Sequence, residues 1–172
     1  TATSEPGVGS TFTIFLPPAT VPAAEPARVV EPKTPRGSGE AVLVVDDELI
    51  VSEVAATLLR RLGYHPHICH SGERALEILQ ADPGSFALIF TDLNMPRLTG
   101  LDLIRALREA GDSTPCVLTT GFIGSGATED EARALGVSGI VEKPFTERTL
   151  GLAINTALAK TRPPASVSTS AP

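Results

Sequence analysis

Five apolar segments alternate with helix-forming segments between residues 40 and 160, and this alternation constrains the fold more than any other feature. We predict strands at residues 41–45, 64–70, 86–91, 116–119 and 139–142, each followed by a helix. The first and third strands are continuous apolar runs, which is typical of strands covered by helices on both faces. Five β–α units of this length predict an α/β fold, a doubly wound parallel sheet with right-handed crossovers. Pro66 cannot donate to a strand ladder, so the second strand is predicted to lie at an edge.

Helical periodicity predicts which faces of the first and last helices are buried. Apolar residues recur three and four positions apart in both segments, as in amphipathic helices. The predicted inward residues are Val51, Val54, Ala55, Leu58 and Leu62 in the first helix, and Leu150, Ala153, Ile154, Ala157 and Leu158 in the last. Gly63 is predicted to end the first helix.

Charge and composition argue against several functional classes. The formal net charge is −6, and an acidic protein is poorly suited to nucleic acid, whose phosphates need a basic face. No stretch approaches the roughly 18 uninterrupted apolar residues of a membrane helix, so we expect no direct membrane contact from this segment. Cys69 and Cys116 are too few for a disulfide framework, which favours a reducing compartment and a cytoplasmic location.

The flanks of the predicted α/β domain, residues 40–160, differ from it in composition. Residues 17–39 combine prolines with small and polar residues, which predicts an extended linker, and residues 161–172 are predicted to be a disordered tail. Residues 1–16 end in an apolar alternation from Thr11 that favours a strand. This strand has no evident partner, so we expect residues 1–16 to be the end of a domain lying mostly upstream, in a longer protein that could be anchored in a membrane.

Polar residues follow four of the five predicted strands. These residues are Asp46 and Asp47, Thr91 and Asp92, Thr119 to Gly121, and Glu142 to Pro144. The carboxyl ends of parallel strands meet at one edge, where α/β proteins bind ligands. Converging carboxylates suit a hard cation such as Mg²⁺, and a carboxylate beside such a cation can attack phosphorus. The simpler alternative is that the aspartates only cap the following helices.

These motifs resemble the receiver domain of two-component response regulators. The resemblance covers residues 40–160 and rests on residues 42–48 (VLVVDDE), 91–96 (TDLNMP) with Gly100, 120–121 (TG) and 142–145 (EKPF). It implies a flavodoxin-like sheet of strand order 2-1-3-4-5. It also implies a cis peptide before Pro144.

The resemblance implies a role for each matching residue. Asp92 would accept a phosphoryl group, Thr120 would supply a switch hydroxyl and Lys143 would pair with the phosphoryl group. The implied ligands of Mg²⁺ are Asp46, Asp47, Asp92 and the main-chain carbonyl of Asn94. Ile140 departs from the family, which often has an aromatic residue there, so the usual coupling of Thr120 to an aromatic ring is in doubt.

Residues 6–17 (PGVGSTFTIFLP) are similar to the last glycine-containing box and final strand of a histidine-kinase ATP-binding domain. Together with the receiver motifs, they suggest the carboxy-terminal end of a hybrid sensor histidine kinase. The full-length protein would then be a protein histidine kinase, whereas this segment lacks most of an ATP site. Whether the segment counts as an enzyme beyond slow self-dephosphorylation stays open.

The expected function is a phosphorelay receiver that takes a phosphoryl group from a phosphohistidine onto Asp92. The donor would be a kinase dimerisation or phosphotransfer domain, in the same chain or another, with a histidine phosphotransfer protein and a homodimer as further partners. One alternative is a docking module that is never phosphorylated. The other is a phosphatase with an aspartate nucleophile, although such enzymes generally want a second carboxylate where Asn94 stands.

Overall fold

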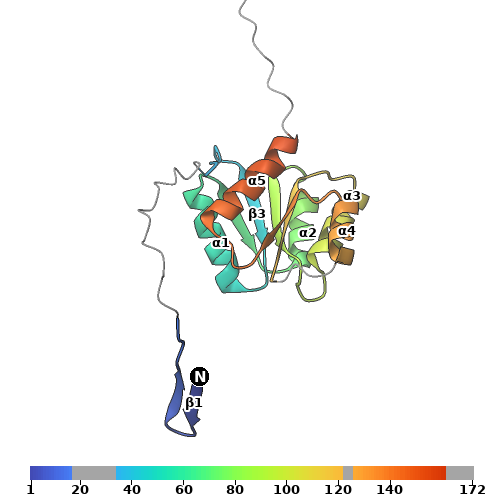
Figure 1. Ribbon diagram of the computed structural model, residues 1–172. Coiled ribbons are helices and arrows are strands. Elements are labelled where there is room, and N and C mark those ends of the chain that lie inside the picture. The colour runs from blue at the N-terminus through green and yellow to red at the C-terminus, as the bar shows by residue number, and fades with distance from the viewer. Residues whose placement is uncertain (17–33, 122–125, 162–172) are drawn as a thin grey trace, which may run out of the picture. The chain divides into compact units, whose positions relative to one another are not determined.

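The computed structural model describes residues 1–16, 34–121 and 126–161; the first range belongs to one compact unit and the other two ranges belong to a second. Figure 1 shows the described residues in colour. Most of the predicted linker and nearly all of the predicted tail fall outside the described residues. The proposed division of the chain into domains therefore stays a prediction.

The first unit contains a β-hairpin. Strand β1 (Ala2–Glu5) pairs antiparallel with β2 (Gly9–Phe12), with Ala2 opposite Phe12. The expectation that the strand near Thr11 has no partner in this sequence is therefore wrong, because the polar segment at the chain start pairs with it. Every described residue of the hairpin is exposed, including Phe12 at 77%. A lone hairpin without a core is marginally stable in water, so the hairpin is incomplete as a folding unit.

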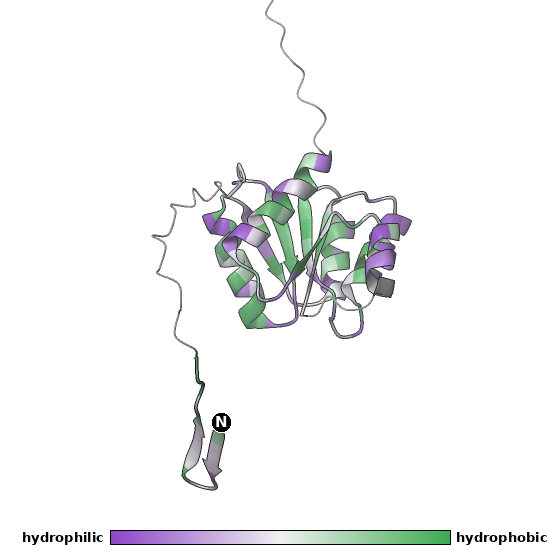
Figure 2. Ribbon diagram, viewed as in Figure 1, coloured by the Kyte–Doolittle hydropathy of each residue, from purple (hydrophilic) through white to green (hydrophobic). Residues whose placement is uncertain are grey.

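The second unit is built on a parallel five-stranded sheet of order β4-β3-β5-β6-β7, as the resemblance implied. Its strands are β3 (Ala41–Val45), β4 (His65–Cys69), β5 (Leu88–Asp92), β6 (Cys116–Thr120) and β7 (Gly139–Glu142). Strand β4, which contains Pro66, lies at an edge as predicted. Figure 2 shows hydrophobic residues concentrated along this sheet, and β5 and β6 are buried throughout.

Five helices cover the sheet in two layers (Figure 1). The helices are α1 (Leu49–Arg61), α2 (Gly72–Ala81), α3 (Gly100–Glu109), α4 (Gly126–Ala134) and α5 (Glu147–Thr161). One core lies under α1 and α5 and includes Leu59, Phe90 and Ile154. The other lies under α2 and α3 and includes Leu79 and Ile104. Because apolar side chains fill both faces, the polar strand ends are left at the edge of the sheet.

Helix α1 is rotated from the predicted orientation. Ala55 and Leu62 are buried as expected, but Val54 is 48% exposed and Ser52 is fully buried, so the prediction of an inward Val54 is wrong. The hydroxyl of Ser52 donates to the main-chain oxygen of Leu49 at 2.9 Å, which satisfies it inside the core. This rotation leaves Leu49 and Ile50 exposed beside the carboxyl edge of the sheet. The inward residues predicted for α5 are buried or partly buried.

Residues 34–39, at the end of the predicted linker, are fixed to the second unit. The amides of Gly37 and Gly39 donate to the main-chain oxygens of Leu62 and Gly63 at 2.8 and 2.9 Å. A Cβ at Gly37 would overlap the buried ring of Tyr64, so only glycine fits there without a shift. Gly63 has a φ of +88°, which favours glycine at the end of α1 as predicted.

Candidate functional site

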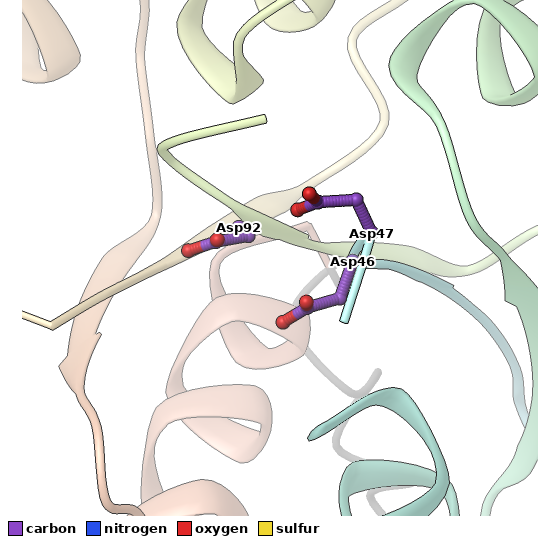
Figure 3. A group of neighbouring side chains, drawn as sticks. All are labelled: Asp46, Asp47 and Asp92. Carbon is purple, nitrogen blue, oxygen red and sulfur yellow. The ribbon is translucent and has the colours of Figure 1, made fainter. Parts of the chain in front are cut away.

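Three carboxylates gather at the carboxyl edge of the sheet (Figure 3). Asp46 and Asp47 directly follow β3, and Asp92 is the last residue of the neighbouring strand β5. One carboxylate oxygen from each of the three lies within 4.8 Å of the others. Asp46 and Asp92 are 4% and 6% exposed, whereas Asp47 is exposed to solvent. The buried strands β3 and β5 thus place two carboxylates at the edge of the core, beside the exposed carboxylate of Asp47.

Lys143 places its ammonium group between two of these carboxylates. Its Nζ lies 2.8 Å from Asp46 Oδ2 and 3.2 Å from Asp92 Oδ2. Glu48 Oε1 is farther away, at 3.9 Å, and largely exposed. Lys143 follows β7, and its amide donates to the main-chain oxygen of Thr120 at 2.8 Å. The Lys143–Pro144 peptide is cis, as the resemblance implied.

Burial and charge shift the proton affinities in this site. Burial raises the pKa of Asp92, and the nearby Asp46 raises it further, although Lys143 and the Leu93 amide oppose the change. Burial alone would lower the pKa of Lys143, but its hydrogen bonds and charge interactions with Asp46 and Asp92 outweigh that effect and raise it. Lys143 therefore stays protonated, and Asp92 gives up its proton less readily than an ordinary aspartic acid.

The two oxygens of Asp92 have different surroundings. Oδ1 accepts a hydrogen bond from the Leu93 amide at 2.9 Å and another from the Thr119 hydroxyl at 3.4 Å. Oδ2 faces the ammonium group of Lys143. The carboxylate is therefore held by neutral donors on one side and by a cation on the other.

Thr119 is a neighbour of Asp92 that sequence reasoning did not select. It is the ladder partner of Asp92 in β6 and is 1% exposed. Thr120, to which the resemblance assigns the switch hydroxyl, is also buried at the end of the same strand, and its role stays a prediction. The strand register would have identified Thr119, but register is not visible in the sequence.

Two further sequence predictions concern the surroundings of the site. Asn94 lies in the loop after β5 and is exposed, and its proposed role as a ligand stays a prediction. Ile140, in place of the usual aromatic residue, is partly buried on β7 and packs against the core under α2 and α3. The glycine-rich loop after Gly121 falls largely outside the described residues.

The donor set suits a hard cation. Three carboxylates with one ammonium group leave an excess of negative charge at the site. Oxygen-only donors at the rim, with Asp47 open to solvent, match a cation that keeps several of its waters. The acidic cluster can therefore hold a metal ion.

Cys69 and Cys116 are both buried and unpaired. Burial raises the pKa of the Cys116 thiol to about 11, which makes it unreactive. Among the described helices, none is long and apolar enough to cross a membrane.

The fold and the site together define a class: flavodoxin-like α/β proteins with an acidic cluster at the carboxyl edge of the sheet. A family model described as the response regulator receiver domain matches residues 42–155. The chain therefore belongs to the response regulator receiver domain family.

Similar proteins include a sensor kinase, a chemotaxis protein and a respiration control sensor protein. The chain is 31% identical over 167 residues to the sensor kinase CckA of Brucella abortus, covering 91% of this chain and 17% of that protein. It is 37% identical over 112 residues to the chemotaxis protein CheY of Pseudomonas aeruginosa, covering 63% of this chain and 88% of CheY. It is 32% identical over 151 residues to the aerobic respiration control sensor protein ArcB of Escherichia coli, covering 85% of this chain and 18% of ArcB. The chain thus spans less than a fifth of each sensor protein.

Solved structures support the same fold. The chemotaxis protein CheY4 of Vibrio cholerae aligns with a TM-score of 0.63 at 29% identity, covering 69% of this chain and 98% of that chain. A receiver domain protein from Clostridium thermocellum aligns with a TM-score of 0.66 at 27% identity, covering 71% and 96%.

Proposed function

We propose that this protein is a phosphorelay receiver in which Asp92 accepts a phosphoryl group from a phosphohistidine. The observation that carries the proposal is the position of Asp92, whose carboxylate lies with those of Asp46 and Asp47 and 3.2 Å from Lys143. The family membership supports the same reaction. A nucleophilic carboxylate, further acidic groups and a fixed cation at one open edge are the parts that phosphoryl transfer to aspartate needs.

Each residue of the site has a separate role in the phosphoryl transfer. An Asp92 oxygen attacks phosphorus, the new oxygen–phosphorus bond forms, and the phosphorus–nitrogen bond of phosphohistidine breaks. The electron pair of that bond leaves with the imidazole. Lys143 lies where it can balance the negative charge of the new phosphoryl group, and Thr120 is the hydroxyl that we expect to contact it. Later attack by water on the same phosphorus returns Asp92 as a carboxylate and releases phosphate.

Mg²⁺ is the cation that we propose for the acidic cluster, with Asp46, Asp47, Asp92 and the main-chain carbonyl of Asn94 as its protein ligands. When bound, Mg²⁺ would offset the charge that builds up on the transferring phosphoryl group. Before transfer, Lys143 neutralises part of the charge of Asp46 and Asp92.

The donor and the longer protein are part of the proposal. Two of the relatives are sensor proteins of which this chain covers less than a fifth, and residues 6–17 are similar to the end of a kinase ATP-binding domain. We infer that the chain is a receiver-containing part of a hybrid sensor histidine kinase in the cytoplasm. Its donor would be a phosphohistidine of the same kinase or of a phosphotransfer protein.

The test is the intact mass of the protein after incubation with acetyl phosphate, with and without Mg²⁺. We expect wild type to gain one phosphoryl group only with Mg²⁺, and Asp92→Asn to gain none. Asp130→Asn is the matched control, because Asp130 is an exposed aspartate paired with Arg133 on α4. It should gain the group as wild type does.

Two other results would overturn the proposal. If neither acetyl phosphate nor a phosphorylated histidine kinase labels wild type in saturating Mg²⁺, the protein is a docking module. Steady turnover of a small phosphate ester by wild type, lost in Asp92→Asn, would instead indicate a phosphatase with an aspartate nucleophile.

A further inference from the structure

We propose that Thr119 is a positioning residue for the phosphoryl acceptor: its hydroxyl holds Asp92 Oδ1 so that Oδ2 is presented for attack. This inference rests on the proposed function, since it assigns a role in the same reaction. Thr119 Oγ1 lies 3.4 Å from Asp92 Oδ1 and donates a hydrogen bond to it.

The strand ladder fixes the hydroxyl in this place. Thr119 and Asp92 are register partners in the parallel pair of β6 and β5. Their side chains lie on the same side of the sheet as Val117 and Phe90, which belong to the core under α1 and α5. Thr119 is β-branched and 1% exposed, so its side chain has little rotational freedom. The donor is therefore in place before any phosphoryl donor arrives.

The hydrogen bonds on Oδ1 determine which oxygen can react. The Leu93 amide and the Thr119 hydroxyl both donate to Oδ1. Two donors oriented toward one oxygen resist rotation of the carboxylate, which otherwise turns readily about its terminal bond. Oδ2 then remains beside Lys143, where a new phosphoryl group would meet a positive charge. Without the hydroxyl, the Leu93 amide is the one neutral donor left on Oδ1 among the described residues, and the carboxylate is held less firmly.

A neighbouring threonine provides a matched comparison. Thr91 is fully buried at the preceding position in β5, and its hydroxyl donates to the main-chain oxygen of Asp92 at 3.1 Å. Thr91→Val and Thr119→Val each delete a buried hydroxyl from adjacent strands. Only Thr119→Val removes a hydrogen bond to the carboxylate itself.

The experiment follows phosphorylation by acetyl phosphate at saturating Mg²⁺ through intact mass against time. We expect Thr119→Val to slow the reaction about fivefold to tenfold, the effect of losing one neutral hydrogen bond. Thr119→Ser restores the hydroxyl and should stay within about twofold of wild type, as should Thr91→Val. Thermal unfolding of each variant shows that it is folded at the assay temperature.

Three outcomes overturn the inference. The first is that Thr119→Val reacts at the wild-type rate. The second is that Thr119→Ser is as slow as Thr119→Val, which would assign the effect to packing and not to the hydroxyl. Equal slowing by Thr91→Val would assign it to general disturbance of the strands. Failure of the proposed function is distinguishable from these, because wild type would then gain no phosphoryl group or Asp92→Asn would gain one.

Discussion

Gly100, the first residue of α3, lies so close to the main-chain oxygen of Asp92 that a Cβ at this position would overlap it. The amide of Gly100 also donates to the main-chain oxygen of Leu93 at 3.0 Å. The start of the helix is therefore packed directly on the backbone of the proposed acceptor. Any group larger than hydrogen must push α3 away from β5.

Gly100→Ala is expected to lower the free energy of unfolding by about 1–3 kcal/mol, the usual cost of overpacking. Urea denaturation measures this change. Gly139→Ala is the control, because a Cβ at Gly139 meets nothing within 4 Å and its position in β7 tolerates a side chain. Equal stability of Gly100→Ala and wild type would contradict the close contact.

Lys143→Met is expected to destabilise the protein in the absence of divalent cations by about 1–3 kcal/mol, because two buried carboxylates lose their ammonium partner. Mg²⁺ should stabilise this variant more than it stabilises wild type, since it replaces the lost charge. Urea denaturation with and without Mg²⁺ tests both effects. Lys160→Met is the control, because it removes an exposed ammonium group that donates to the Ser138 carbonyl. It should show neither the loss of stability nor the larger stabilisation by Mg²⁺.

Asp92→Asn is expected to raise the Tm at pH 7 in the absence of divalent cations. Burial raises the pKa of Asp92, so its charged form costs stability at pH values above the folded pKa. That cost disappears as the pH falls through the folded pKa toward the ordinary value of 3.8, because the buried group becomes protonated. The difference in Tm should therefore shrink between pH 7 and pH 4. A lower Tm for Asp92→Asn at pH 7 would contradict the direction of the shift.

Asp47→Asn is expected to weaken Mg²⁺ binding, because it removes one of the three clustered carboxylates. A ligand at a hundred times its Kd stabilises a protein by about 2.7 kcal/mol, so Mg²⁺ should raise the Tm of wild type in a concentration-dependent way. The variant should need more Mg²⁺ for the same rise, and EDTA should abolish the rise in both. Asp130→Asn, on exposed α4, should follow wild type. Identical Mg²⁺ titrations of Asp47→Asn and wild type would place the ion elsewhere.

The sequence predicted the sheet because its signals are local: apolar runs, helix periodicity and the proline in β4. The meeting of Asp46, Asp92 and Lys143 followed from topology alone, since all three end parallel strands. Thr119 was not selected because its contact with Asp92 depends on the register of β6 against β5, which the sequence does not show. The buried face of α1 was predicted wrongly because hydrophobic periodicity treats serine as an outward, polar residue. Ser52 is buried, and its hydroxyl donates to the main-chain oxygen of Leu49.

Two other features, strand β1 and the attachment of residues 34–39, could not be predicted from the pattern of side chains. Strand β1 consists of residues ATSE, whose small and polar side chains show no alternation, and it is held to β2 by main-chain pairing. The attachment of residues 34–39 likewise depends on the amides of Gly37 and Gly39. Every residue except proline carries the main-chain groups that make such hydrogen bonds, so composition alone does not reveal where they form.

The attachment of residues 34–39 also bears on how the domain can be joined to others. Gly37 and Gly39 bind next to the end of α1 and the start of β4, and Lys160 at the end of α5 reaches the Ser138 carbonyl before β7. Both covalent connections are thus made at the rim where strands begin, whereas the carboxylates stand where strands end. Segments joined to either end of this domain would therefore enter and leave it at the edge opposite the acidic cluster, and they would leave that cluster accessible to another protein.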